Sequence, residues 1–154
     1  MNNMRRTTGL CGVLLLAVAI IGTIGVKSVG ARATQTGVPD APEKGKVFKT
    51  RSLEVDFSPF KVVFLELGSD RCIPCRQMQP IMKDIAAAFP DDVLVVFYDV
   101  WEDPAPARKY KVQLIPTQIF LDGAGKELFR HMGLYPKDEI LKILEKQGLK
   151  PKGS

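Results

Sequence analysis

The sequence predicts an α/β fold in which helices flank a central mixed β-sheet. Three short runs of β-branched, aromatic and other apolar residues predict buried strands, at 61–67, 93–98 and 117–121. Helical patterns separate or follow these runs, which is typical of parallel strands joined by helices. A turn at 122–125 leads into an antiparallel partner at 127–130, so we expect the sheet to be mixed.

The helices are predicted from apolar spacing and from prolines. After the first strand, apolar side chains recur at helical spacing until Pro90 ends the pattern. These apolar positions are Met78, Ile81, Met82, Ile85 and Phe89. Residues 103–110 predict a short helix or turn, because Pro104 suits a first helical position. Residues 136–147 predict a closing amphipathic helix, and residues 47–57 are expected to add a strand or a turn of helix.

The chain of 154 residues suits a single domain preceded by a leader. We interpret residues 1–33 as the leader, residues 34–46 as a linker rich in Pro, Gly and charge, and residues 47–150 as the domain. The formal net charge is +5, but four basic residues and no acidic one precede Thr34. The rest of the chain carries 18 basic and 17 acidic residues and offers no basic face for nucleic acid.

The leader combines a basic head with a long uncharged run. Arg5 and Arg6 precede residues 7–26, which carry no charge, and this order is typical of an export signal. Residues 31–33 (Ala-Arg-Ala) fit a signal-peptide cleavage site, whereas the length of the run also suits a membrane anchor. The alternative is a buried helix of the domain. We expect the domain to lie in the bacterial periplasm or on the outer face of the cytoplasmic membrane, either secreted or anchored.

Two of the three cysteines lie at a predicted strand-to-helix junction. Cys72 and Cys75 bracket Ile73 and Pro74 just before the first helix, whereas Cys11 lies in the leader. A helix N-terminus favours the thiolate, which is the attacking species in thiol–disulfide exchange. The two-residue spacer lets Cys75 reach back to a mixed disulfide on Cys72. The pair therefore favours a dithiol/disulfide redox centre.

Other uses of the two thiols are open from the residues alone. Half of a zinc site would need further ligands, and the remaining soft candidates are Cys11 and His131. A copper site would combine the two thiolates with His131 or a methionine. A structural disulfide is the third alternative, although so short a loop would constrain the unfolded chain little. We expect neither a metal ion nor a cofactor.

The motif and its surroundings resemble the thioredoxin family. Cys72 and Cys75 match the family's active site with a changed spacer. The other matching residues are the helix-kinking proline Pro80, the cis-proline loop Ile115-Pro116-Thr117, and the turn glycines Gly123 and Gly133. The resemblance covers about residues 60–147 and implies a thioredoxin-like fold.

The resemblance also implies a role for each residue of the site. Cys72 is expected to be the nucleophile and Cys75 the resolving thiol. Pro116 is expected to form a cis peptide bond beside them, so that the backbone at Ile115 pairs with an extended substrate segment. The residues expected to bind substrate are Ile73, Pro74, Ile115 and Pro116.

Glu66 lies six residues before Cys72, where the family usually has a buried aspartate that helps to move the proton of the resolving cysteine. It stands in an apolar strand between Leu65 and Leu67. Burial raises the pKa of a carboxyl toward the range that is useful for proton transfer. We therefore expect Glu66 to be a catalytic residue, and the alternative is a side chain that reaches water at the end of the sheet.

The sequence departs from the family beside this site. Arg71 stands where a tryptophan commonly precedes the first cysteine, and Phe97 replaces a lysine that the family often has on the next strand. These changes alter the electrostatics around the thiols, so the redox potential cannot be taken from the family. We interpret Trp101 as a packing or surface residue and His131 as a surface or hairpin residue.

These observations predict an extracytoplasmic thiol–disulfide oxidoreductase that reduces protein disulfides. The spacer retains a proline and lacks a histidine, which favours a reductase. A transmembrane reductase is the kind of electron donor that we consider, with cytochrome c maturation or disulfide repair as destinations. The alternatives are a disulfide-donating oxidase and a thiolate-based copper or zinc chaperone. We expect a monomer whose partners are disulfide-bearing proteins, with no nucleic acid, and with the membrane only through an uncleaved leader.

Overall fold

The computed structural model describes residues 42–153. The chain divides into units 1–35 and 36–154, and every described residue lies in the second. The predicted leader and most of the predicted linker therefore lie outside the described residues. Among residues 42–153, no helix is both long enough and apolar enough to cross a bilayer.

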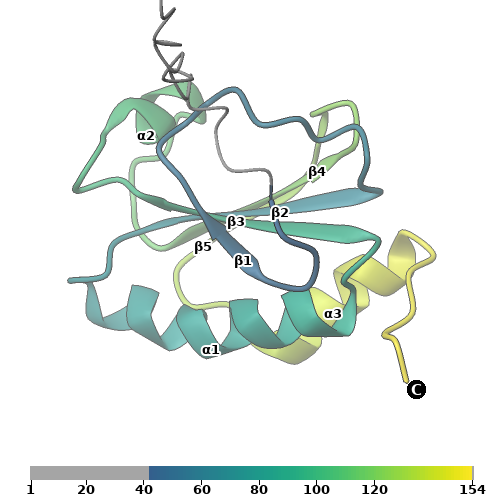
Figure 1. The fold of residues 1–154 in the computed structure, drawn as a ribbon. Helices are drawn as coiled ribbons and strands as arrows, with labels where there is room; N and C mark the ends of the chain where they lie inside the picture. The colour runs from purple at the N-terminus through teal and green to yellow at the C-terminus, as the bar shows by residue number, and fades with distance from the viewer. Residues whose placement is uncertain (1–41, 154) are drawn as a thin grey trace, which may run out of the picture. The chain divides into compact units, whose positions relative to one another are not determined.

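Five strands form one sheet, which is mixed as the sequence predicts (Figure 1). The strands are β1 (Val47–Lys49), β2 (Val62–Gly68), β3 (Val93–Asp99), β4 (Thr117–Asp122) and β5 (Glu127–Met132). Their order in the sheet is β1-β3-β2-β4-β5. Strands β1, β3 and β2 pair in parallel, whereas β4 is antiparallel to β2 and β5 is antiparallel to β4. The antiparallel hairpin follows the two parallel crossovers, so both strand directions occur.

Helices cover both faces of the sheet. They are α1 (Ile73–Ala88), α2 (Ala105–Lys109) and α3 (Lys137–Lys146). Figure 1 shows α1 and α3 on one face and α2 on the other. Each face has its own apolar core, one under α1 and α3 and one under α2 and the chain between β1 and β2. Because both faces are covered, β2 and β3 are buried at every residue, which is why the sequence there reads as continuous apolar runs.

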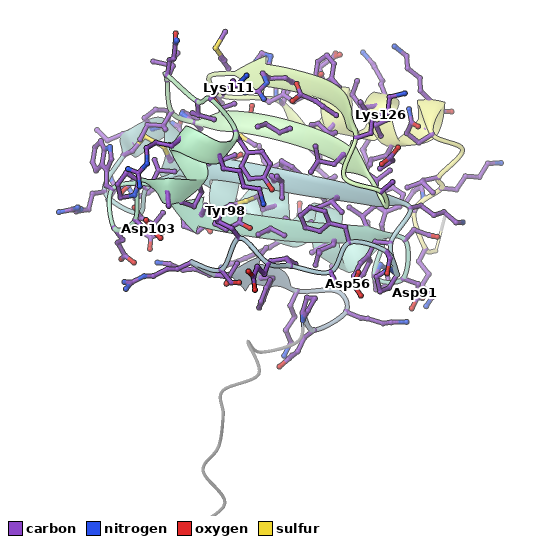
Figure 2. The ribbon with its side chains drawn as sticks, turned by 90° about the horizontal axis from the view of Figure 1, so that it is seen from above. Asp56, Asp91, Tyr98, Asp103, Lys111 and Lys126 are labelled. Atoms are coloured by element: carbon purple, nitrogen blue, oxygen red, sulfur yellow. A yellow bond between two sulfur atoms is a disulfide. The ribbon has the colours of Figure 1, made fainter. Side chains whose placement is uncertain are left out.

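The two weakly predicted segments take short forms. In residues 47–57 the strand is the correct alternative, and it has three residues at the edge of the sheet. In residues 103–110 the short helix is correct, with Pro104 at its N-cap. On that face of the sheet Tyr98 projects from β3 (Figure 2) and its hydroxyl donates to the carbonyl of Ser52 at 3.0 Å. This bond ties the irregular chain after β1 to the central strands.

Candidate active site

The two cysteines of the motif form a disulfide at the N-terminus of α1. Cys72 is the N-cap residue, and its sulfur accepts a hydrogen bond from the backbone N–H of Cys75 at 3.4 Å. The Cα atoms of the pair are 5.2 Å apart. The first-turn N–H groups and the dipole of a 16-residue helix therefore point at the sulfur of Cys72. A thiolate formed there on reduction is stabilised by both.

The two sulfurs differ in access. Cys72 retains 9% of its surface, whereas Cys75 is fully buried. Arg71 and Arg76, which flank the pair in the sequence, are exposed. The geometry gives an incoming disulfide access to Cys72 only, and it leaves Cys75 to act within the protein.

Gly68, the last residue of β2, permits Cys75 to pack against the end of this strand. A Cβ atom at this position would lie 3.1 Å from the Cβ of Cys75 and 3.2 Å from its sulfur. The buried thiol therefore lies directly over the end of the strand. Glu66 is two residues earlier on the same face of β2, roughly 7 Å along the strand, because successive side chains alternate between faces.

Glu66 is completely buried, as the sequence predicts, and does not reach water at the end of the sheet. Gln118, its direct partner on β4, is equally buried, and its Nε2 donates to Oε2 of Glu66 at 3.0 Å. Burial raises the pKa of Glu66 to about 8, and the hydrogen bond from Gln118 offsets that rise only in part. A carboxyl that titrates near neutral pH beside a thiol is suited to exchange protons with it.

Asp99 holds the loop that carries Cys72. It ends β3, beside Gly68 in the sheet. Its Oδ2 accepts from the backbone N–H of Asp70 at 3.0 Å and from the hydroxyl of Ser69 at 3.3 Å. Its Oδ1 accepts from the backbone N–H groups of residues 101 and 102 at 3.0 and 3.3 Å. Burial alone would raise the pKa of Asp99, but these four donors outweigh it and lower the pKa below the ordinary value.

The peptide bond between Ile115 and Pro116 is cis, as the resemblance implies. Leu67 of β2 pairs with Thr117 of β4, so the register places Pro116 at the end of the sheet that carries the disulfide. The carbonyl of Pro116 accepts from the N–H of Gly133 at 2.8 Å. Gly133 has a φ of 96°, a conformation that favours glycine over other residues.

Exposed apolar side chains surround this end of the sheet. Ile73 of the spacer is 66% exposed, and Leu114, beside the cis-proline loop, is 56% exposed. Of the other predicted substrate-binding residues, Pro74 is exposed, Ile115 is half-buried and Pro116 is buried. An exposed apolar rim around a disulfide is suited to contact an unfolded or extended protein segment.

Trp101 belongs to the surroundings of the site. It is a surface residue, as expected, with 54% of its surface exposed. The guanidinium of Arg71 lies 5.6 Å from the centre of its ring. The sequence interpretation missed this contact with Arg71, which depends on the turn after β3 that Asp99 holds.

The acidic residues near the disulfide surround a lysine. Within residues 42–153, the one group of three or more side chains with metal-ligand spacing is Asp70, Asp99 and Glu102. The ammonium of Lys49 lies 2.6 Å from Asp70 and 3.8 Å from Glu102, so a cation of the chain already meets these carboxylates. The same ammonium lies 5.6 Å from the centre of the ring of Phe97, the residue that replaces a lysine of the family.

His131 stacks on an aromatic ring, and the helix methionines are core residues. His131 lies on β5 opposite Gln118, is half-buried, and stacks on Tyr135 with ring centres 4.2 Å apart. Met78 and Met82 are buried in the core under α1, as expected. Cys11, the third candidate from the sequence, lies outside the described residues.

Comparison with known proteins decides the family. A family model described as Thioredoxin matches residues 47–146. The chain belongs to the thioredoxin family. Thioredoxins from Chlamydia trachomatis and Staphylococcus aureus are each 34% identical to it over 85 residues, which are 55% of this chain and 81% of each relative. With the Cys72–Cys75 disulfide in place, the protein is a thiol–disulfide oxidoreductase of the thioredoxin type.

Solved thioredoxin structures share the fold. A thioredoxin from Nicotiana alata is 28% identical and superimposes with a TM-score of 0.59, covering 68% of this chain and 95% of its own. A mutant thioredoxin from Halobacterium salinarum superimposes with a TM-score of 0.63 at 22% identity, covering 70% of this chain and 96% of its own. The predicted thioredoxin-like fold is therefore confirmed.

Proposed function

We propose that this thioredoxin works outside the cytoplasm as a reductase of protein disulfides. The observation that carries the direction is the spacer, since Ile73-Pro74 retains a proline and lacks a histidine. The backbone N–H of Cys75 and the two flanking arginines favour the Cys72 thiolate, which is the nucleophile that exchange needs in either direction. The location is supported by the uncharged run of the leader.

The proposed reaction uses the two cysteines in turn. The Cys72 thiolate attacks one sulfur of a client disulfide, and the other client sulfur leaves as a thiolate. Cys75 then gives up its proton to Glu66 and attacks the sulfur of Cys72. The Cys72–Cys75 bond forms and the second client sulfur leaves. A membrane-bound dithiol donor is proposed to return two electrons to the pair.

A client segment is proposed to lie between Ile73-Pro74 and the cis-proline loop. The backbone at Ile115 would pair with it as an added strand, and the exposed apolar rim would contact its side chains. Backbone pairing needs no particular sequence, so this mode fits a reductase with several clients.

The reduction potential tests the direction. We expect the isolated domain to equilibrate with glutathione or a reference dithiol at a reducing potential, well below that of strongly oxidising relatives. A value near the strongly oxidising end, about −120 mV, would instead support the disulfide-donating alternative. Stoichiometric copper or zinc on the purified reduced domain, lost in a double Cys72→Ser and Cys75→Ser variant, would support a metal chaperone.

Two further experiments test the nucleophile and the location. Cys72→Ala is expected to abolish reduction of insulin, and retained activity would contradict the assignment. Cys75→Ala is the matched variant, which is expected to accumulate a mixed disulfide with the client.

Mass spectrometry of the mature protein distinguishes a chain that starts at Thr34, expected for secretion, from an uncleaved anchored chain. An uncleaved chain in the cytoplasmic fraction would contradict the proposed location.

A further inference from the structure

Glu66 and Gln118 form an isolated polar pair inside the core. They face each other directly across β2 and β4, and neither side chain is exposed. Their one hydrogen bond runs from Nε2 of Gln118 to Oε2 of Glu66 at 3.0 Å. On the other side of Glu66 its partner in β3 is Phe97, which offers no polar group. Gln118 is therefore the side chain that sets the polar environment of this carboxyl.

The hydrogen bonds of the pair balance only when the carboxyl is protonated. Within residues 42–153, two buried side-chain oxygens have no hydrogen-bond partner, and they are Oε1 of Glu66 and Oε1 of Gln118. Both are acceptors, and a buried acceptor without a donor is unfavourable. A proton on Oε1 of Glu66 removes one orphaned acceptor and supplies a donor for the other. The third buried atom without a partner, Nε2 of Gln79, makes no hydrogen bond to either residue.

No charged or titratable group of the described residues around the pair supplies the missing hydrogen-bond donor in place of this proton. On β1, the ammonium of Lys49 is held by Asp70, on the far side of Phe97. On β5, His131 lies opposite Gln118 and stacks on Tyr135. Toward the same end of the sheet, the neighbouring elements also carry Asp99 at the end of β3, Arg76 on the exposed side of α1, and the disulfide itself. No basic side chain donates a hydrogen bond to Glu66 in the described part of the chain.

We propose that Gln118 is a positioning residue for thiol–disulfide exchange, which pairs with protonated Glu66 through two hydrogen bonds and keeps one of them to the carboxylate. In the oxidised protein the amide N–H donates to Oε2 and the carboxyl O–H donates to the amide oxygen. The amide thereby fixes the rotamer of the acid, and because its N–H bonds more strongly to the charged carboxylate, Gln118 lowers the pKa of Glu66.

A proton moves between Glu66 and Cys75 whenever the disulfide is reduced or formed. When a donor dithiol adds two electrons, the Cys72–Cys75 bond breaks, and the sulfur of Cys75 takes the proton of Glu66. The resulting carboxylate keeps the N–H of Gln118 as its donor. In the reverse step Cys75 returns the proton to Glu66 as it attacks the mixed disulfide. The inference rests on exchange itself and is independent of the direction and location proposed above.

Titration of Glu66 in the oxidised protein tests the role of Gln118, because Cys72 and Cys75 do not titrate in that form. Infrared spectroscopy detects the carbonyl band of a protonated carboxyl, and its absence in Glu66→Gln assigns it. We expect the wild-type band at pH 7 and its loss with a midpoint at about pH 8. In Gln118→Leu the midpoint is expected to rise by about one pH unit, because a donor to the carboxylate is lost. The pH dependence of insulin reduction should shift with it.

Ile119→Val is the matched control, since this residue is the neighbour of Gln118 on β4 and belongs to the opposite core. It is expected to leave the midpoint unchanged. If Gln118→Leu does not fold, Gln118→Met provides a second unbranched apolar substitution. An unchanged midpoint in a folded Gln118 variant would overturn the proposal. So would the absence of a protonated Glu66 band in the wild type at pH 7, which requires no variant of Gln118.

Discussion

Two buried carboxyl groups lie near the disulfide, and their surroundings shift their pKa values in opposite directions. Asp99 ends β3 and accepts four hydrogen bonds, from two neighbouring segments of backbone and one hydroxyl. Glu66 lies on the adjacent strand and accepts one, from a side-chain amide. The pKa of Asp99 is lowered, and the pKa of Glu66 is raised to about 8.

The difference shows that burial alone does not decide what a carboxyl does. Enough donors keep Asp99 ionised, and an ionised carboxylate is a fixed acceptor that can hold the loop before Cys72. With one donor, desolvation dominates at Glu66, and the side chain becomes an acid that can gain or lose a proton near neutral pH. One group organises the site, and the other is available for its chemistry.

Removing the Asp99 carboxylate, which holds the loop before Cys72, has the largest expected effect. Asp99→Ala leaves four donors without their acceptor, and we expect a loss of about 3 kcal/mol in the free energy of unfolding, since some of the donors regain water. Denaturant unfolding of the oxidised protein measures it. Asp99→Asn is the matched variant, because its single oxygen can retain half of the bonds and should cost about half as much. Equal stability of Asp99→Ala and the wild type would contradict the anchoring role.

Removing the carboxyl of Glu66, the proposed proton carrier, has the second largest expected effect. Glu66→Gln keeps the size and polarity of the side chain but cannot exchange a proton. We expect thiol–disulfide exchange to slow by roughly tenfold to a hundredfold, at or below the lower end of what a positioned acid or base supplies. Stopped-flow reduction of a client disulfide measures the rate. A rate equal to that of the wild type would leave Glu66 a purely structural residue.

The smallest effect is expected at Lys49, which lies on the edge strand β1 next to β3. Its ion pairs with Asp70 and Glu102 are largely exposed, so Lys49→Met should change stability by less than about 1 kcal/mol, and by less again in high salt. Thermal unfolding at two salt concentrations measures this. A large loss of exchange activity in Lys49→Met would show that this ammonium acts on the thiols, contrary to the separation described above.

The fold was predictable because its central strands are buried on both faces. Continuous apolar runs located β2 and β3, and the turn before β5 located the hairpin. The edge strand β1 and the helix α2 were ambiguous because they have three and five residues, too few for a periodic pattern. Such short elements form through tertiary contacts, here with β3 and with the second core.

The chemistry-bearing residues were also predictable, whereas the residues that position them were not. The cysteine motif and the interrupting Glu66 are visible in the sequence. Gln118 similarly interrupts an apolar strand, and this signal could have found it, but the register that places it opposite Glu66 belongs to the sheet. Asp99 reads as an ordinary polar residue after a strand, because the donors that it gathers come from two separate loops.

The central claim is that Glu66 is a protonated acid in the folded, oxidised protein, and the pH dependence of stability tests it most directly. The folded pKa of about 8 exceeds the ordinary glutamate value of 4.5, so the folded state binds the proton more tightly. Stability contributed by this proton is fully present below pH 4.5 and is lost as the pH rises through 8.

We predict that the free energy of unfolding of the oxidised wild type falls relative to that of Glu66→Gln between about pH 4.5 and 8. The relative loss can reach roughly 5 kcal/mol and should level off at higher pH. Asp99→Asn should show the opposite sign, with the advantage of the wild type lost only as the medium becomes acidic. Parallel stability curves for the wild type and Glu66→Gln across this range would contradict the account.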